Sequence, residues 1–203
     1  MTQKQKTHRL AVAAMLTAVA AVLQFVEFAI PLMPSFIKLD ISDLPALLGT
    51  FSLGPVYGVA IQLAKNLLHL PFGSSAGVGE LSNFILGAVF VFVAGIIYKH
   101  NKSRKSALVG SVAGAAAMAL VSIVTNYFIV YPAYVVLYKL PLEAIVGMYE
   151  AILGGVSHVP TQNALLNCLL VFNVPFTLVK GLLDAVLCLL IYKPLSPILH
   201  GRK

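Results

Sequence analysis

Long apolar runs separated by short polar breaks occupy almost the whole chain. Since a helix needs roughly 20 mostly apolar residues to cross a bilayer, several of these runs are long enough to span one. The pattern predicts an all-α integral membrane protein, one domain over residues 1–203, with six transmembrane helices. We expect these helices at about residues 10–28, 43–53, 55–70, 80–98, 107–130 and 174–192.

The region 43–70 is either one long helix or two short ones. Gly54-Pro55 interrupts it, and proline fits the first turn of a helix better than its middle. Most of the 14 Lys and Arg residues lie at the N-terminus, in the loop 99–105 and in the tail. The positive-inside tendency favours the cytoplasm for all three clusters, which requires a turn at Gly54-Pro55. The second helix is then about 16 Å long, too short to cross a bilayer alone.

The acidic side chains favour the same orientation. Asp184 lies deep in a span, whereas the other acids fall near the expected outer ends of helices: Glu27, Asp40, Asp43, Glu80, Glu143 and Glu150. The stretch 131–173 contains several prolines and glycines, and we expect it to form an extracellular segment. The sequence therefore predicts cytoplasmic termini and a polar outer face.

Composition supports a chain embedded in lipid. Hydrophobic residues make up 59% and charged residues 10% of the sequence, with a mean hydropathy of +0.92, whereas soluble domains carry about 25% charged residues. The net charge of +7 comes from clusters between apolar runs, which is typical of membrane orientation rather than of nucleic-acid binding. The basic start indicates a retained span and not a signal peptide.

Several kinds of chemistry have no sequence signal in the chain. There is no Walker A sequence and no His or Cys pair at metal-ligand spacing, so we expect no ATP hydrolysis, no metal site and no cofactor. Cys168 and Cys188 lie in apolar surroundings and are expected to be packing residues.

The loop from Phe36 to Pro45 is the first candidate region for a ligand. Its polar and apolar residues alternate, which is typical of an extended strand that could lay backbone groups over a ligand. Lys38, Leu39 and Asp40 are candidate contacts here, although Lys38 and Asp40 could equally face solvent. Asp43 is more simply explained as the N-cap of the short helix.

Two further polar regions lie at the outer ends of later helices. Glu80 and Asn83 share a helix face; Glu80 could merely complement the helix dipole, but an unpaired amide at Asn83 would be costly. Asp184 lies on one face with Lys180, and we expect these two to form a structural ion pair that still lets Lys180 contact a ligand. The remaining candidate contacts are Asn126, Tyr127, Asn173, Thr177 and Lys180.

Small residues form a stripe on the first helix, with Ala14 and Ala18 as a small-xxx-small unit. Such stripes let helix backbones approach closely in lipid. The partner is either another protein or another helix of this chain. Gly110, Gly114 and Ala117 form a rival stripe.

Four of these segments, in this order, resemble the riboflavin-binding S components of energy-coupling factor (ECF) transporters. The segments are Ala14-xxx-Ala18 and residues 36–45, 79–84 and 175–181, and the resemblance covers essentially the whole chain. It implies a six-helix subunit that captures the vitamin outside, under the loop between helices 1 and 2 and among helices 4 to 6. It also implies a transmembrane T component and two ATP-binding subunits as partners, with Ala14 and Ala18 docking on the T component.

The resemblance has two departures. Asn is common in the family at the position of Thr177, and threonine has a shorter reach. The stretch 131–173 is also longer than expected for a member of this family, and the resemblance implies no role for it.

The expected function is therefore that of the vitamin-binding subunit of an uptake transporter in the bacterial plasma membrane, with riboflavin as the ligand. The alternatives are another vitamin or a flavin such as FMN, an integral membrane enzyme, and a self-sufficient secondary transporter. The enzyme would need paired acids or a metal cluster at one depth, and the secondary transporter often carries an inverted repeat. The sequence contains neither signal.

Overall fold

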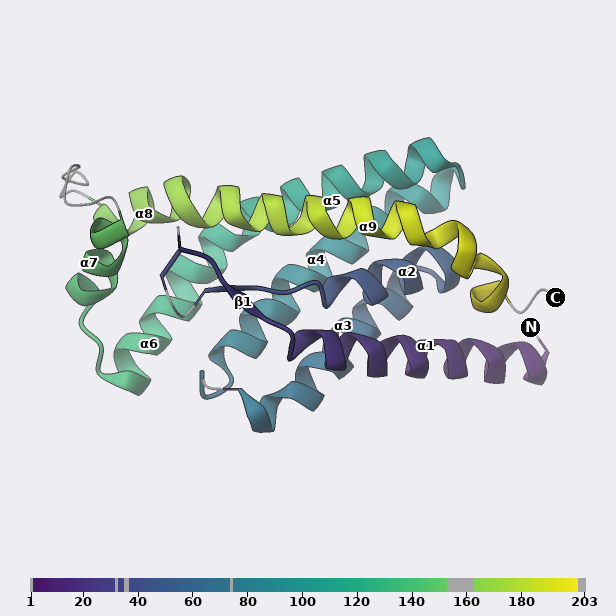
Figure 1. Ribbon diagram of the computed structural model, residues 1–203, viewed down its shortest axis with the longest axis horizontal. Helices are drawn as coiled ribbons and strands as arrows, with labels where there is room; N and C mark the ends of the chain where they lie inside the picture. Colours follow the sequence, from purple (N-terminus) through teal and green to yellow (C-terminus); the bar gives the residue numbers. More distant parts are fainter. Residues whose placement is uncertain (1, 32, 35–36, 74, 153–162, 201–203) are drawn as a thin grey trace.

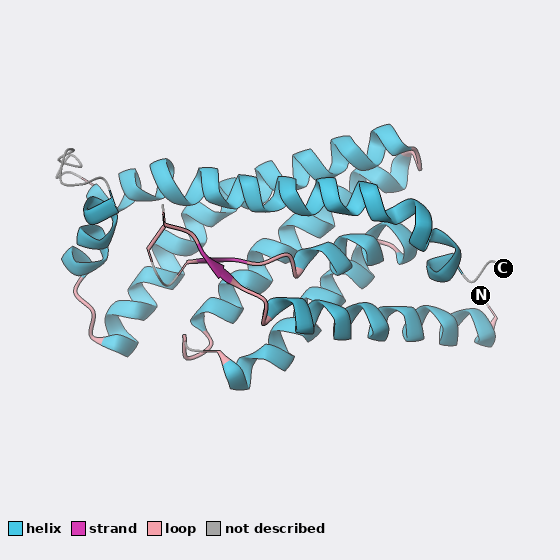
Figure 2. Ribbon diagram, in the orientation of Figure 1, coloured by secondary structure: helices cyan, strands magenta, loops and turns pink. Residues whose placement is uncertain are grey.

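The structure, a computed structural model, describes residues 2–31, 33–34, 37–73, 75–152 and 163–200 (Figure 1). These residues form a bundle of α-helices with one two-stranded hairpin (Figure 2). The elements are α1 (Gln3–Gln24), β1 (Phe28–Ala29), β2 (Lys38–Leu39), α2 (Asp43–Leu53), α3 (Pro55–His69), η1 (Leu70–Phe72), α4 (Val78–His100), α5 (Arg104–Thr125), η2 (Asn126–Val130), α6 (Tyr131–Tyr138), α7 (Leu142–Ile152), α8 (Ala164–Cys168), η3 (Leu169–Asn173) and α9 (Val174–His200).

α1 begins and ends earlier than the expected 10–28. A capping box starts it, since the Thr2 hydroxyl accepts from the Gln5 amide at 3.3 Å and the Gln5 side chain accepts from the Thr2 amide at 3.0 Å. After Gln24 the chain turns into β1, which pairs antiparallel with β2. The expected strand is therefore confirmed at Lys38–Leu39, while Phe36 lies outside the described residues.

The turn expected at Gly54-Pro55 is present. Gly54 has a φ of 115° and a ψ of 166°, a backbone region that essentially only glycine adopts, and Pro55 opens α3. α2 is buried along nearly its whole length and contacts α1, α3, α4 and α9. A helix too short to cross the bilayer is therefore surrounded by protein, which satisfies the requirement that its ends avoid lipid.

Two helices extend further toward the hairpin end than the sequence predicts. α5 continues through η2 into α6 and ends at Tyr138, and the helical run that includes α9 starts at Ala164. η2 and η3 are π-helical turns, and Pro132 or Pro175 follows each within two residues. Because proline clashes with the carbonyl four residues back, a widened π turn lets the helix continue past it.

The stretch 131–173 is therefore largely helical in its described part. Its two ends belong to the long helical runs, α7 lies between them, and residues 153–162 lie outside the described residues. The boundaries predicted from the prolines are wrong because neither proline ends its helix.

Within the described residues, four helical runs are long and apolar enough to cross a membrane, and α2 and α3 are shorter elements packed among them. The start of α1, the end of α9 and the loop before α5 lie at one end of the bundle (Figure 1). The hairpin, α6 and α7 lie toward the other end. The all-α membrane prediction is confirmed, with spans at Gln3–Gln24, Val78–His100, Arg104–Tyr138 and Ala164–Leu195.

The two small-residue stripes have different surroundings. A Cβ on Gly110 would lie 2.7 Å from the Ala94 carbonyl oxygen, and one on Gly114 would lie 2.5 Å from the Phe90 carbonyl oxygen. This stripe therefore brings α5 against α4 within the chain. Ala14 and Ala18 are exposed on α1, so packing inside this chain does not account for them.

Candidate ligand pocket

A cavity of about 690 Å³ lies at the hairpin end of the bundle, within the usual size range of small-molecule pockets. Leu39 and Tyr127, although described, do not line it: Leu39 pairs with Phe28 in the hairpin, and Tyr127 packs against an apolar cluster. The structure brings the other predicted contacts together in the lining: Lys38, Asp40, Glu80, Asn83, Asn126, Asn173, Thr177 and Lys180.

Lys180 reaches from α9 to the loop before α2. Its Nζ donates to Asp40 Oδ2 at 2.8 Å and lies 3.4 Å from Asp43 Oδ2. The expected ion pair with Asp184 is wrong, because both Asp184 carboxylate oxygens are buried without a hydrogen-bond partner among the described residues. The carboxylates of Asp40, in the loop before α2, and of Asp43, the first residue of α2, both lie within 4 Å of Lys180 Nζ. The Lys180 side chain therefore pairs with these two groups instead of with Asp184.

Lys65 is a buried cation that the sequence analysis missed. Its Nζ donates to Asp43 Oδ1 at 2.5 Å and to the Ser42 hydroxyl at 2.6 Å, and Gln62 donates to the same Asp43 oxygen at 2.9 Å. Asp43 is therefore not the expected N-cap but the shared anion between Lys65 and Lys180. The signal in the sequence was a lysine three residues after a glutamine in a mostly apolar helix.

Asp40 fixes the loop between the hairpin and α2. Its Oδ1 accepts from the Ser42 amide at 2.9 Å and also from the Ser42 hydroxyl. Burial by itself raises the pKa of Asp40, but the positive charges of Lys180 and Lys65 outweigh burial and hold this pKa below its ordinary value. Asp40 is therefore an anion that joins the loop to α9. Lys38, further out on β2, is already paired with Glu27.

Glu80 lines the pocket and has two polar partners. The His69 ring nitrogen Nδ1 lies 3.0 Å from Glu80 Oε1, and the Ser75 hydroxyl donates to Glu80 Oε2 at 2.8 Å. Glu80 is thus a positioned carboxylate in the pocket wall as well as an acid in the first turn of α4.

A buried hydrogen-bond network attaches α7, which does not itself line the pocket, to two residues of the pocket wall. The Tyr149 hydroxyl donates to Asn173 Oδ1 at 2.6 Å, Asn173 Nδ2 donates to the Tyr131 hydroxyl at 3.3 Å, and the two tyrosine hydroxyls also pair with each other. Asn126 and Asn173 belong to the π turns η2 and η3. π turns inside α-helices are frequent at functional sites. The tyrosines had no signal in the sequence, since α6 and α7 were not expected as helices.

The lining combines aromatic rings with neutral polar groups. Phe25, Phe72, Phe176 and three tyrosines of α6 contribute rings, and asparagine and threonine contribute donors and acceptors. The described residues include no group of three or more His, Cys, Asp or Glu that could hold a metal ion. Such a pocket can hold a flat aromatic molecule with polar edges.

The family model for the substrate-specific component of ECF transporters matches residues 8–192. The riboflavin transporter RibU of Staphylococcus aureus strain TCH60 is 34% identical over 192 residues, covering 95% of this chain and 92% of that protein. The riboflavin transporter FmnP of Bacillus subtilis is 31% identical over 201 residues, covering 98% and 97%. A solved structure, described as the S component of a bacterial ECF transporter, has a TM-score of 0.72 and 34% identity, with coverage of 97% and 99%. The chain therefore belongs to the substrate-specific S components of ECF transporters, which are multi-pass transport proteins of the bacterial cell membrane.

Proposed function

We propose that this S component binds riboflavin from outside the cell and delivers it inward with an energy-coupling module. The observation that carries the proposal is the pocket lining, which places aromatic rings beside neutral amides and hydroxyls. Riboflavin has a flat aromatic ring system with polar edges and an uncharged chain of hydroxyls. The identity with relatives named riboflavin transporters supports the same ligand.

The charges in the pocket favour the neutral vitamin over its phosphate. Lys38 and Lys180, the two lysines of the lining, each have a carboxylate partner within 4 Å, so their charges are already balanced. Glu80 adds a negative charge to the wall. The phosphate of FMN would be repelled by the Glu80 carboxylate, and no unpaired lysine in the lining would offset this repulsion.

The distribution of charge supports an outward-facing pocket. The basic clusters belong to the end that carries both termini, and six of the seven acids belong to the hairpin half or the pocket. By the positive-inside tendency, the end with the termini is cytoplasmic. The cavity then faces the outside, where a vitamin is captured.

Delivery requires partners, because the chain carries no ATP-binding sequence of its own. An S component works with an energy-coupling module, here proposed to be a transmembrane T component and two ATP-binding subunits. Ala14 and Ala18 are exposed on α1 and offer a close-packing face for the T component. In the proposed cycle, the subunit tilts in the membrane and releases riboflavin inside when the module hydrolyses ATP.

Flavin binding to the purified chain tests the ligand. Riboflavin fluorescence should be quenched on titration in detergent, with a dissociation constant below micromolar. The chain purified from riboflavin-fed cells should also carry a flavin absorption band. Affinity weaker than micromolar for every flavin would exclude riboflavin as the ligand.

A second titration tests the preference for the neutral vitamin. FMN should bind at least about tenfold more weakly than riboflavin, since one unfavourable charge contact of about 1.4 kcal/mol has this effect. Glu80→Gln should reduce the difference in affinity between riboflavin and FMN by improving FMN binding. Glu143→Gln, an exposed position on α7 outside the pocket lining, removes the same charge and serves as the control. Equal affinity for both flavins would instead favour the alternative, a component for flavins in general.

A further inference from the structure

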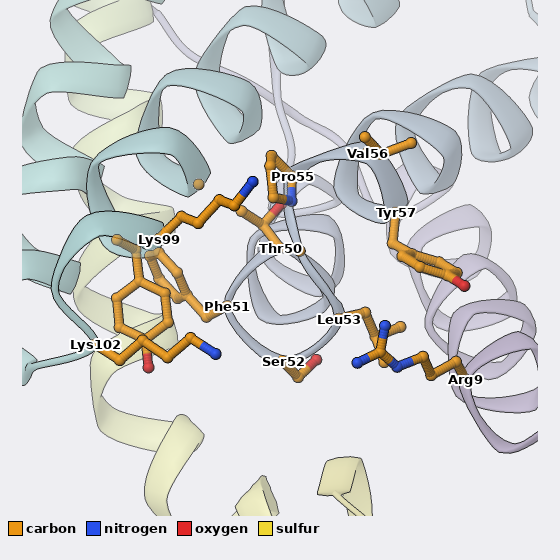
Figure 3. Close-up of a pocket in the computed structure, with 13 residues that line it drawn as sticks. Arg9, Thr50, Phe51, Ser52, Leu53, Pro55, Val56, Tyr57, Lys99 and Lys102 are labelled. Carbon is orange, nitrogen blue, oxygen red and sulfur yellow. The ribbon is translucent and has the colours of Figure 1, made fainter. Parts of the chain in front are cut away.

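A second cavity, of about 350 Å³, lies at the other end of the molecule, where α2 ends and α3 begins (Figure 3). Arg9 reaches it from α1, and Lys99 and Lys102 reach it from the end of α4 and the loop that follows. Figure 3 shows the three charged groups on opposite sides of the end of α2, each extending toward it. No acidic side chain lines this cavity.

No acidic side chain balances the three cations. Arg9, Lys99 and Lys102 have no ion pair or side-chain hydrogen bond with any described residue, in contrast to Lys38 and Lys180 of the ligand pocket. Helix ends offset their charge only in part. α2 ends and α3 begins at Gly54-Pro55, so their half-charges of about −0.5 and +0.5 lie side by side and cancel, and the half-charge of about −0.5 at the end of α4 offsets part of the charge of Lys99.

Apart from Thr50 and Ser52, the rest of the lining is apolar or aromatic, and part of it faces outward. Val56 is 73% exposed, and the rings of Tyr57 and Tyr98 line the same cavity as the cations. Tyrosine at a helix end is typical of the level of lipid headgroups. A site for a small soluble anion would not require such an apolar side, whereas a phospholipid presents a phosphate and an acyl chain together.

We propose that this cavity, named here the cation cavity, binds the phosphate headgroup of an anionic phospholipid. Lys99 and Lys102 hold the phosphate on one side of the end of α2, Arg9 adds its positive charge from the other side, and the apolar rim around Val56 contacts the glycerol and the upper acyl chain. Basic pockets between helices at a membrane surface are recognised sites for anionic headgroups. The ligand pocket at the opposite end takes no part, so this inference does not depend on the identity of the vitamin.

Native mass spectrometry of the full chain in detergent tests the site, with dioleoyl-phosphatidylglycerol as the probe and dioleoyl-phosphatidylcholine as the neutral lipid. The triple variant R9Q/K99Q/K102Q should bind phosphatidylglycerol at least about tenfold more weakly, because each Lys or Arg near an anionic surface contributes about fivefold. The matched control K4Q/K6Q/K105Q removes the same charge from exposed positions at the same end and should stay within about twofold of the wild type.

Four outcomes would overturn the proposal. The first is an equal loss of affinity in the triple variant and its control, which would indicate general surface charge, and the second is an unchanged affinity in the triple variant. The third is displacement of the lipid from the wild type by millimolar inorganic phosphate, which would indicate a site for a soluble anion. The fourth is a triple variant that binds lipid normally but no longer co-purifies with the coupling module, which would indicate protein docking. Circular dichroism and elution volume check the fold of each variant. Lys102→Gln alone, in the loop after α4, should still lower the affinity about fivefold.

Discussion

At the scale of single residues, the buried charges at the start of α2 are linked by one lysine from a distant helix. Lys180 joins Asp40 and Asp43 to α9, and Lys65 joins Asp43 to α3. Breaking a buried pair by removing one partner leaves an uncompensated charge, and this typically costs about 3–5 kcal/mol. The loop over the pocket therefore depends on Lys180 for its position.

Lys180→Met should strongly destabilise the protein and abolish flavin binding, since Asp40 then lacks its cation. Thermal unfolding followed by circular dichroism measures the first effect and fluorescence quenching the second. Asp184→Asn is the matched control on the same helix, because neither Asp184 oxygen has a partner among the described residues. We expect this variant to be as stable as the wild type or more stable. An equal loss in both variants would contradict this assignment of the ion pairs.

A second prediction concerns the Tyr149 hydroxyl, which we expect to stabilise the attachment of α7. Tyr149→Phe removes the donor to Asn173 and should cost about 1–3 kcal/mol, because Asn173 is left with a buried unsatisfied oxygen. Hydrogen exchange should rise in Leu142–Ile152 in particular. Tyr127→Phe is the control, since Tyr127 is outside the pocket lining. A larger loss of flavin binding in the control would restore Tyr127 as a ligand contact.

At the scale of elements, the predictable parts were those set by local pattern. The turn at Gly54-Pro55 and the strand at Lys38–Leu39 followed from glycine, proline and alternation. The helices beyond Val130 and before Val174 did not, because Pro132 and Pro175 normally mark helix limits, whereas here a π turn precedes each. The pairing of Lys180 with Asp40, 140 residues apart, depends on tertiary packing that local spacing does not encode.

Gly54 provides a prediction about the turn itself. Gly54→Ala meets no atom within 4 Å, so its cost comes from the backbone at φ 115° alone, and should be about 1–3 kcal/mol. Gly147→Ala is the control, since its Cβ also meets no atom within 4 Å and Gly147 lies inside α7. There alanine should stabilise by about 0.5–1 kcal/mol. Thermal melts of both variants measure the difference, and a harmless Gly54→Ala would mean that the turn tolerates another conformation.

At the scale of the whole molecule, three features that we propose to be functional lie on different parts of the surface. The ligand pocket lies at one end, the cation cavity at the other, and an exposed alanine pair lies on the side of α1. The sequence predicted the membrane environment and eight residues of the pocket lining, because composition and buried polar residues report these directly. It did not predict the cation cavity, since Arg9 and Lys99 are 90 positions apart and meet only when α1 and α4 are assembled around α2.

A variant of the exposed pair Ala14 and Ala18 should impair transport without impairing flavin binding. Ala14→Leu/Ala18→Leu adds bulk to an exposed face, so flavin affinity and the melting temperature should stay near wild type. Co-purification with the coupling module and vitamin uptake by cells should fall at least about tenfold, because leucine keeps the partner helix from approaching closely. Ala116→Leu, an equally small exposed residue on α5, is the control and should leave both unchanged. If uptake survives in the double variant, or falls equally in the control, the docking face is not on α1 and the prediction is wrong. A loss of flavin binding would mean instead that α1 packs inside this chain at these positions.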